Sequence, residues 1–407
     1  MVVTSAAPLA SAALTTTVLL VFAQMLPATL VAPAIRPLFA KYHAGAEGAA
    51  HAFMAVNMLG AIVAGPLLGA DADRRRDPRH LLPILALCDA ILLGVLALPI
   101  PTGAMLALRL LEGAAHVGGM TLLLSEASGQ RTTRGASAMG WAGGALMLAV
   151  ACGSALGSLL VAFDPRAPFW AGAAIAAAVG LAALVAPAPE VAAKPAPRLG
   201  WRGVVEVARA IPVPVATAFV GRFAVGCLVV SFALFGHRAH ALSDRHVGAL
   251  FTIFTFTFAL GMVPAELVAR TVGRAVVLAT GLALEAAAFL SFGWLPPEAL
   301  PAAMCVGGLA AAGVFATTLA YGAAHSAGGR ATAMGAIGAS GSLGMLLGPA
   351  AAGVACAVLR TPEAPLRGYR VAFGLGAAAH VALLVVASRW LMARAREERC
   401  ASGADRA

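Results

Sequence analysis

Long apolar stretches recur along the whole chain, most of them about twenty residues or more and almost free of charged side chains. A stretch of that length, wound as an α-helix, crosses the roughly 30 Å hydrocarbon core of a bilayer and satisfies its own backbone hydrogen bonds there. A soluble domain carries roughly 25% charged residues, whereas this chain of 407 residues carries 11% and is 60% hydrophobic. The sequence therefore predicts an all-α membrane protein.

Twelve transmembrane helices are predicted, six in each half of the chain. The predicted spans lie at about 12–35, 50–70, 81–100, 102–124, 136–162 and 167–187, and then at about 213–236, 247–269, 275–294, 300–321, 331–358 and 369–392. The predicted domains are an N-terminal six-helix bundle over 1–187 and a C-terminal six-helix bundle over 212–392. A basic, Pro-rich cytoplasmic linker over 188–211 joins the bundles, and a polar cytoplasmic tail over 393–407 is expected to be disordered.

The basic residues of the loops predict the orientation, because cytoplasmic loops carry an excess of Lys and Arg. With a cytoplasmic N-terminus, 18 Lys and Arg residues fall on the cytoplasmic side and 8 on the opposite side. No basic residue precedes the first apolar run near Ser11, so this run is expected to be a retained helix and not a cleaved signal peptide. The prediction is a multi-pass protein of a bacterial-type inner membrane with both termini in the cytoplasm.

Several function classes are disfavoured by the same residues. The net charge of +10 comes from loops between apolar segments, not from one polar face of the kind that binds nucleic acid. No two of the six cysteines have metal-ligand spacing, and five lie inside apolar spans. The chain has neither a Gly-x-x-x-x-Gly-Lys-Ser/Thr loop nor a His-Glu-x-x-His motif. We therefore expect no enzyme activity, no metal, no cofactor and no nucleic-acid partner.

Short motifs recur at a constant offset of 195 residues. The matching pairs are Met139-Gly140 with Met334-Gly335, Gly143 with Gly338, Gly153 with Gly348, and Asp71 with Glu266. An even number of predicted spans separates the copies, so the two halves share one orientation in the membrane. A parallel repeat of this kind is typical of one large transporter class, in which the substrate binds between the halves near the bilayer midplane.

Three motifs resemble those of a known family. They read Gly69-Ala-Asp-Ala-Asp73-Arg74-Arg75-Arg76 after the second span, Arg109-Leu-Leu-Glu112-Gly113 in the fourth, and Gly344-Met-Leu-Leu-Gly348-Pro349 in the eleventh. These are similar to the Gly-x-x-x-Asp-Arg-x-Gly-Arg, Arg-x-x-Gln-Gly and Gly-x-x-x-Gly-Pro motifs of the major facilitator superfamily, and most similar to those of its twelve-helix drug:proton antiporter branch. Antiporters of the family carry the Gly-Pro hinge in the fifth span, where this chain reads Gly153-Ser154.

The resemblance implies a role for each motif. Gly69, Asp73, Arg74 and Arg75 would form a conformational latch between neighbouring helix ends at the cytoplasmic face. The fourth span would line the central cavity, and its arginine, Arg109, would take part in proton movement.

The fourth span also carries a pattern of polar residues that can be interpreted without the resemblance. Arg109, Glu112 and His116 lie at i, i+3 and i+7, so they form one polar stripe within about 60° on an apolar helix. Ionisable groups at membrane depth are costly and usually serve function. The hypothesis is that Glu112 takes up and releases the coupling proton, Arg109 shifts the pKa of Glu112, and His116 relays the proton. The alternative is an Arg109–Glu112 ion pair that only packs the bundle.

Other polar residues inside spans are weaker candidates. Arg222 in the seventh span and Gln24 in the first are candidate contacts to substrate in the cavity. Asp89 and Glu285 lie in the third and ninth spans, which are peripheral in the family, and structural pairing is favoured for both. The hinge and packing candidates have glycine at one-turn spacing, which allows close helix contact; they are Gly153, Gly157, Gly344, Gly348 and Pro349.

The predicted function is secondary active transport. The chain would export a small amphipathic compound, such as a drug or a secreted metabolite of the siderophore type, by proton antiport and alternating access. Proton-coupled uptake of a small solute is the first alternative, and a non-transporting membrane sensor with the same fold is the second. The expected partners are the small-molecule substrate, protons and the lipid bilayer, and the protein is expected to be a monomer.

Overall fold

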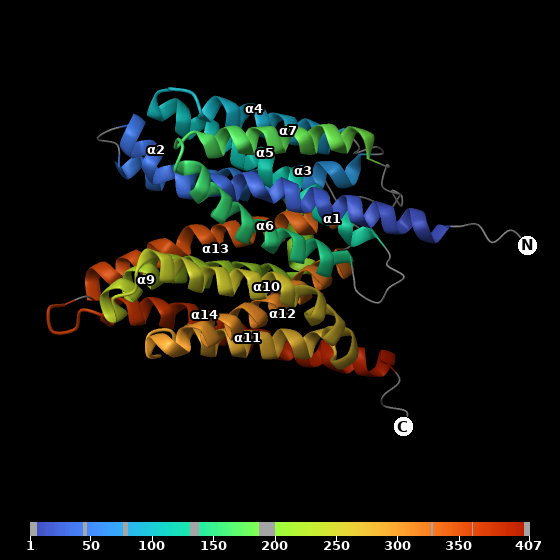
Figure 1. The fold of residues 1–407 in the computed structure, drawn as a ribbon. Helices are drawn as coiled ribbons and strands as arrows, with labels where there is room; N and C mark the ends of the chain where they lie inside the picture. Colours follow the sequence, from blue (N-terminus) through green and yellow to red (C-terminus); the bar gives the residue numbers. More distant parts are fainter. Residues whose placement is uncertain are drawn as a thin grey trace, which may run out of the picture. The chain divides into compact units, whose positions relative to one another are not determined.

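The computed structural model describes residues 6–43, 47–75, 80–130, 138–186, 200–326, 329–359 and 361–402, and every regular element in these ranges is helical (Figure 1). The described residues divide into two compact units. The first unit comes from Met1–Ile211 with Gly322–Ala339, and the second comes from Pro212–Tyr321 with Ser340–Ala407. The helix α13 (Arg330–Leu359) therefore contributes its first turns to one unit and its remainder to the other.

The helices of the first unit follow the predicted order of spans. They are α1 (Ala6–Val31), the short η1 (Ala32–Ala34), α2 (Ile35–Tyr42), α3 (Glu47–Arg74), α4 (Leu81–Leu96), α5 (Thr102–Gly129), α6 (Ala138–Val161), α7 (Ala167–Val185) and α8 (Trp201–Ala210). The most extensive packing joins α3 to α5, α1 to α6, and α4 to α7. A buried core that contains Phe39, Phe53 and Phe169, with rings in edge contact, lies at one end of these helices.

The second unit is also built mainly from long apolar helices. They are α9 (Pro212–His240), α10 (Asp244–Val272), α11 (Arg274–Ser291), η2 (Pro297–Ala299), α12 (Leu300–Ala324), the later turns of α13, and α14 (Arg367–Ser402). The helix α14 packs most extensively on α11 and α9. The ring of Phe292 makes edge contacts with Phe232 and Phe373, whose own rings meet at a tilt, between these three helices.

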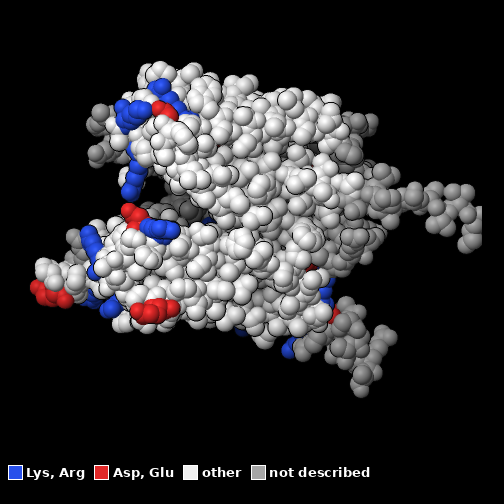
Figure 2. All heavy atoms as spheres, in the orientation of Figure 1, with Lys and Arg blue, Asp and Glu red and all other residues white. Residues whose placement is uncertain are grey.

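The helices match the requirements of a membrane. Ten of the described helical segments are long and apolar enough to span a bilayer. The helix α4 is apolar but shorter, and α5 is long but carries charged side chains; both coincide with predicted spans. On the face drawn in Figure 2, charged side chains gather near helix ends and the surface between them has almost none. Side chains on that kind of surface, such as Val386 at 82% exposed, meet lipid in a membrane-spanning helix.

Glycines bring pairs of these helices into backbone contact. An added methyl group at Gly153 or Gly157 of α6 would collide with Thr29 or Leu30 of α1. In the second unit, a methyl group at Gly344 or Gly348 of α13 would collide with backbone atoms of α9. Lipid offers no hydrophobic drive for helix association, so close backbone packing of this kind stabilises helix pairs in a membrane.

Hydrogen bonds and an ion pair hold the loop between α6 and α7 of the first unit. Asp164, between α6 and α7, accepts hydrogen bonds from Lys41 Nζ at 2.9 Å, from the hydroxyl of Tyr42 at 2.9 Å and from the backbone N–H of Arg166 at 2.7 Å. These bonds, that of Lys41 above all, lower the pKa of Asp164 to about 2. The carboxylate therefore stays ionised, and the end of α2 stays tied to this loop, at any pH near neutrality.

Three expectations differ from the structure. The first apolar segment does not end at 35: it continues through η1 and α2 to Tyr42, because Pro33 interrupts the α-helical bonding only for one short turn. Residues 188–199 of the predicted linker lie outside the described residues, but 201–210 form the amphipathic helix α8, which buries Val204 and Val207.

The third difference is the tail. Residues 393–402, expected to be disordered, continue α14 to Ser402, while 403–407 lie outside the described residues. The reason is tertiary anchoring of good helix-forming residues. Arg394 pairs with Glu397 at 2.7 Å, and Glu398 accepts hydrogen bonds from the hydroxyl of Tyr321 at 2.6 Å and from the backbone N–H of Ala275 at 3.3 Å.

Candidate functional site

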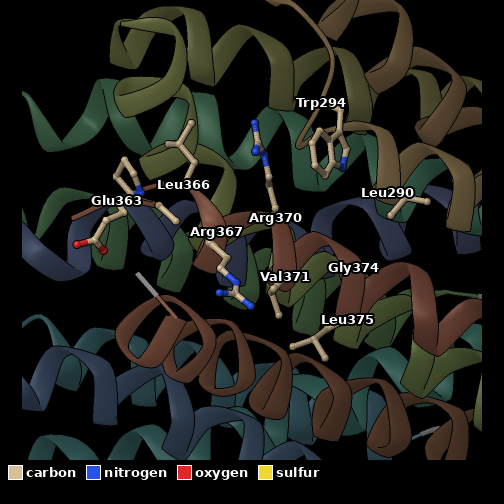
Figure 3. A pocket seen from close by; sticks show the side chains of 11 residues that line it. Leu290, Trp294, Glu363, Leu366, Arg367, Arg370, Val371, Gly374 and Leu375 are labelled. Carbon is tan, nitrogen blue, oxygen red and sulfur yellow. The ribbon is translucent and has the colours of Figure 1, made fainter. Parts of the chain in front are cut away.

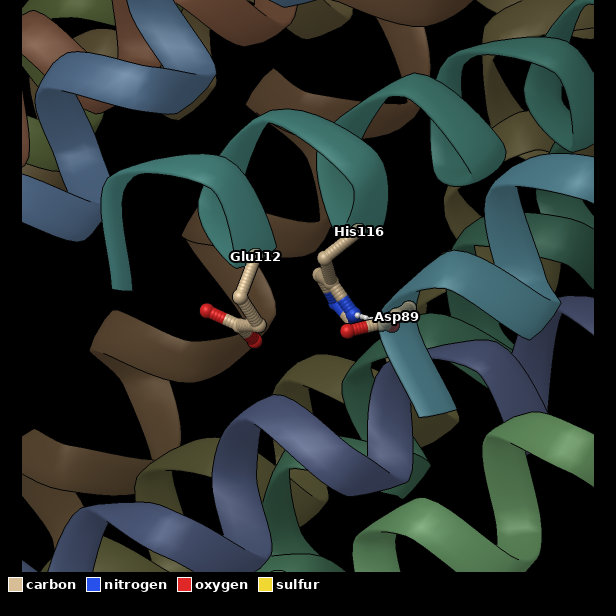
Figure 4. A group of neighbouring side chains, drawn as sticks. All are labelled: Asp89, Glu112 and His116. Atoms are coloured by element: carbon tan, nitrogen blue, oxygen red, sulfur yellow. Dashed lines mark hydrogen bonds and ion pairs between the residues drawn. The ribbon is translucent and has the colours of Figure 1, made fainter. Parts of the chain in front are cut away.

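The three polar residues of α5 point into the first unit. Arg109, Glu112 and His116 are 2%, 0% and 5% exposed. They reach one side of α5 because they are spaced at helical periodicity, and Gly113 lets α5 approach the backbone of α3 at Asn57. The helix α4 lies on the other side and supplies Asp89, which is fully buried (Figure 4). A polar cluster thus forms inside helices that otherwise bury apolar side chains.

The first half of the cluster is an ion pair. A terminal nitrogen of Arg109 lies 2.5 Å from Oε2 of Glu112, and the side-chain amide of Asn57 donates to the same oxygen at 2.7 Å. The guanidinium also lies over the ring of Phe53, 4.8 Å from its centroid. The second carboxylate oxygen of Glu112, Oε1, has no hydrogen-bond partner among the described residues.

The second half of the cluster joins a histidine to a carboxylate. Nδ1 of His116 lies 2.9 Å from Oδ2 of Asp89. The side-chain amide of Gln24 donates to the same Asp89 oxygen at 3.4 Å and to the backbone oxygen of His116 at 3.5 Å. Nε2 of His116 and Oδ1 of Asp89 have no partner within the described part of the chain. The imidazole therefore keeps one nitrogen, and the carboxylate one oxygen, open to a proton.

The charges of the cluster do not balance without an added proton. One carboxylate oxygen of Asp89, one of Glu112 and one ring nitrogen of His116 lie within 4.8 Å of one another. With both carboxylates ionised and the imidazole neutral, the single positive charge of Arg109 leaves a net charge of −1. Burial of an uncompensated charge is strongly unfavourable. One proton, shared among these three side chains, makes the cluster neutral.

The same three side chains are of types that bind metal ions, but their present partners oppose that use. Arg109 and Asn57 occupy one oxygen of Glu112, and Asp89 occupies Nδ1 of His116. A cation here would also lie beside the guanidinium of Arg109. The arrangement suits a proton better than a divalent metal ion.

The structure brings together more residues than the sequence predicted. The stripe of Arg109, Glu112 and His116 was predicted, whereas Asn57 was not, and Asp89 was assigned to a peripheral structural pair. Gln24, a candidate contact to substrate, hydrogen-bonds within the buried cluster. The signal for Asp89 was present in the sequence as an isolated acid in an apolar span, but its partner on α5 could only be seen in three dimensions.

Of the predicted latch, Gly69 and Asp73 meet the beginning of α13. Asp73 accepts hydrogen bonds from the backbone N–H of Ala331 at 3.1 Å, and from the backbone N–H and hydroxyl of Thr332 at 2.8 and 2.7 Å. Gly69 lies so close to the backbone of Ala331 that a side chain would collide with it. All of these residues belong to the first unit.

Of the arginines in that motif, the structure describes Arg74 and Arg75, and no bond of either to the start of α13 is found. Arg75, directly after the end of α3, pairs with Asp71 of α3 at 2.7 Å, and Arg74 is exposed. The proposed latch therefore rests on Gly69 and Asp73.

We expect Asp73→Ala to loosen the start of α13. The substitution leaves two backbone N–H groups without their acceptor, a loss of about 1–3 kcal/mol in local stability. Hydrogen exchange read by mass spectrometry should show faster exchange in peptides that cover 330–340. Asp71→Ala is the matched control, because Asp71 pairs with the neighbouring Arg75 at the exposed end of α3 and not with α13. Equal exchange in the two variants would mean that Asp73 does not hold α13.

Arg222 differs from Arg109 in having no ion-pair partner among the residues that the structure describes. It lies on α9, partly buried, with its side-chain stem against Gly341 of α13. No hydrogen-bond or ion-pair partner is found for its guanidinium among the described residues. A guanidinium is always charged, so at membrane depth it requires water, an anion or an acidic side chain.

The second unit holds another buried carboxylate–histidine pair. Nε2 of His380 on α14 lies 3.2 Å from Oε2 of Glu285 on α11, and the imidazole ring stacks on Phe289. Nδ1 of His380 lies 2.8 Å from the backbone oxygen of Gly376. Structural pairing was favoured for Glu285, and the structure places it in this pair.

Helical bundles with ionisable residues buried at membrane depth are characteristic of transporters that move solutes across membranes. The family model of the Major Facilitator Superfamily matches this chain twice, over residues 17–243 and 215–406. The chain belongs to the Major Facilitator Superfamily. No curated protein matches it significantly.

Two solved structures show the same fold. The human organic anion transporter MFSD10 (TETRAN) matches with a TM-score of 0.77 and 20% sequence identity, covering 92% of this chain and 99% of that one. A mutant of the nucleoside transporter NupG matches with a TM-score of 0.62 and 17% identity, covering 94% of this chain and 99% of that one. At these identities the likeness establishes a transporter fold and not a substrate.

Proposed function

We propose that this chain exports a small amphipathic compound by proton antiport and that Arg109, Glu112, Asp89 and His116 form the proton site. The observation that supports the proposal is the charge of the buried cluster, which is one proton short of neutrality within a membrane-spanning bundle. A site that is neutral with a proton and negative without one changes its electrostatic energy at each uptake and release. That change would alter the relative free energies of the two conformations between which an alternating-access transporter moves.

The geometry suggests a route for the proton. Nε2 of His116 is open, so a proton that binds there converts the imidazole to imidazolium, which remains bonded to Asp89 through Nδ1. Oε1 of Glu112 is the other open acceptor in the cluster. Transfer to Glu112 would neutralise the anion that faces Arg109 and so weaken their ion pair. In this scheme His116 relays the proton and Glu112 and Asp89 hold it. The ion pair of Arg109 weakens when Glu112 is protonated.

The experiment that tests the function is transport into proteoliposomes under an imposed pH gradient. A panel of labelled amphipathic anions, cations and neutral compounds serves as the substrate probe. Antiport predicts accumulation inside vesicles with an acidic lumen, because protons leave as substrate enters. Uptake by symport predicts accumulation in vesicles with an alkaline lumen. A chain that reconstitutes well and moves no compound under either gradient would favour the non-transporting sensor.

Arg222 supports an anionic group on the transported compound. We expect Arg222→Gln to raise the apparent KM for anionic compounds about tenfold or more, the loss associated with one charge-assisted hydrogen bond. Neutral compounds should be transported as before, and Arg222→Lys should retain part of the affinity for anions. An equal loss for anionic and neutral compounds would assign Arg222 to packing of α9 instead of substrate binding.

A further inference from the structure

A cavity of about 740 Å³ lies in the second unit, and its lining includes neither Arg222 nor the buried Glu285–His380 pair. The end of α11, the segment before α14 and the first turns of α14 form its walls (Figure 3). Its lining includes the apolar side chains of Leu290, Val371 and Leu375. Arg370 points toward Trp294, and Arg367 points toward Val371 (Figure 3). The cavity therefore combines an apolar wall with two permanent positive charges.

Its position in the bundle corresponds to the boundary between lipid and water. The helix α11 ends at Ser291 and α14 begins at Arg367, so the cavity lies where two membrane-spanning helices leave the bilayer. Trp294 is 67% exposed, and tryptophan is enriched at this depth of a membrane. Leu290 is 55% exposed, as expected for a side chain that faces lipid tails. The cavity is thus accessible from the bilayer.

The two guanidinium groups keep donors free for a ligand. Arg370 uses Nε to donate to the backbone oxygen of Gly293 at 3.0 Å, and its guanidinium lies 4.2 Å from the centre of the Trp294 ring. This contact fixes the side chain and leaves its terminal amino groups unbonded among the described residues. Arg367 is exposed and has no side-chain partner in the described part of the chain. The carboxylate of Glu363 also borders the cavity, but it points away from both guanidinium groups in Figure 3.

We propose that this cavity binds an anionic phospholipid, with the phosphodiester headgroup at Arg370 beside Trp294, the charge of Arg367 adding to the attraction, and an acyl chain along Leu290, Val371 and Leu375. Guanidinium groups match phosphate oxygens with paired hydrogen bonds. The contact with Trp294 would hold Arg370 at the height of the headgroup, and the apolar side chains of the same cavity would meet the acyl chain. A soluble anion would satisfy the arginines but not the apolar wall, and a zwitterionic lipid would add a cationic group beside two others.

The test uses the full chain in nanodiscs of phosphatidylcholine and follows tryptophan fluorescence. Phosphatidylglycerol with brominated acyl chains, which quench nearby tryptophan, is compared with brominated phosphatidylcholine. We expect stronger quenching by the anionic lipid at equal mole fraction. The chain has five tryptophans, so Trp294→Phe identifies the component that comes from this cavity. Millimolar inorganic phosphate should not displace the lipid.

The variants separate the headgroup contact from a general attraction to charge. Arg367→Gln, which removes a side chain without partners, should weaken the preference for phosphatidylglycerol about fivefold, and Arg367→Gln with Arg370→Gln about thirtyfold. Arg245→Gln is the matched control, because Arg245 is an exposed arginine elsewhere in the same unit. Since Arg370 also anchors Gly293, thermal stability of the double variant is measured alongside. Equal quenching by the two lipids, or a preference unchanged in Arg367→Gln, would overturn the proposal.

Discussion

Proteoliposomes that contain the Glu112→Gln variant are expected to equilibrate substrate across the membrane but not to concentrate it. Under the proposed antiport, a gradient of one pH unit would support up to about tenfold accumulation by the wild-type protein for each proton exchanged. The variant should reach a ratio of about one. The glutamine side chain keeps the size of Glu112 and still offers an oxygen to Arg109 and Asn57, so the fold should be preserved.

The physical reason is the charge of the cluster. Replacement of Glu112 by a neutral side chain leaves Arg109 balanced by Asp89 alone, so the cluster is neutral without an added proton. The same reasoning applies to Asp89→Asn, which leaves Arg109 balanced by Glu112. Each single substitution should therefore remove proton coupling. The double variant would leave a buried positive charge and should express poorly, since an unpaired buried ion is strongly destabilising.

Glu126→Gln is the control for this experiment. Glu126 is another carboxylate of α5, but it accepts a hydrogen bond from Thr17 at 2.8 Å near the end of the helix and takes no part in the buried cluster. This variant should accumulate substrate like the wild type. If Glu112→Gln and Asp89→Asn both retain full gradient-driven accumulation, the cluster is a structural ion-pair network and the proton must bind elsewhere.

The second large effect is expected at the contact between α9 and α13. Gly344→Ala places a methyl group against the backbone oxygen of Phe219, which cannot move aside as a flexible side chain would. Either the two helices separate or the backbone shifts, and overpacking of this kind costs about 1–3 kcal/mol. We expect an apparent Tm several degrees lower in detergent and a slower transport rate. Gly348→Ala should be worse, because a side chain before Pro349 also disfavours the helical conformation.

The control lies on the same helix. Gly353 is exposed on α13, and an added methyl group there would meet nothing within 4 Å. Gly353→Ala should leave the Tm and the transport rate unchanged or slightly raise the Tm, since alanine favours a helix more than glycine does. If Gly344→Ala is as stable and active as Gly353→Ala, then α9 and α13 do not need to approach this closely.

Length and hydropathy alone were sufficient to predict an all-helical membrane protein. An apolar stretch has few alternatives in a bilayer, because every backbone polar group must be bonded within the helix itself. The same rule failed where tertiary contacts decide the outcome. Glu398, in a segment polar enough to be expected to be disordered, is helical because it is bonded by Tyr321 and Ala275, which are distant in sequence.

In the candidate site, too, the sequence predicted local features and the packing of the helices decided the rest. Arg109, Glu112 and His116 could be placed on one face from the sequence, because helical periodicity is a local property of the chain. That His116 meets Asp89, that Asn57 bonds Glu112, and that Gln24 joins the cluster depend on how α1, α3 and α4 pack around α5. The sequence by itself therefore determined a membrane-spanning helical protein and its polar stripe. Only the tertiary structure decided which charges neutralise one another, because electrostatic energy depends on distances between helices that no local pattern encodes.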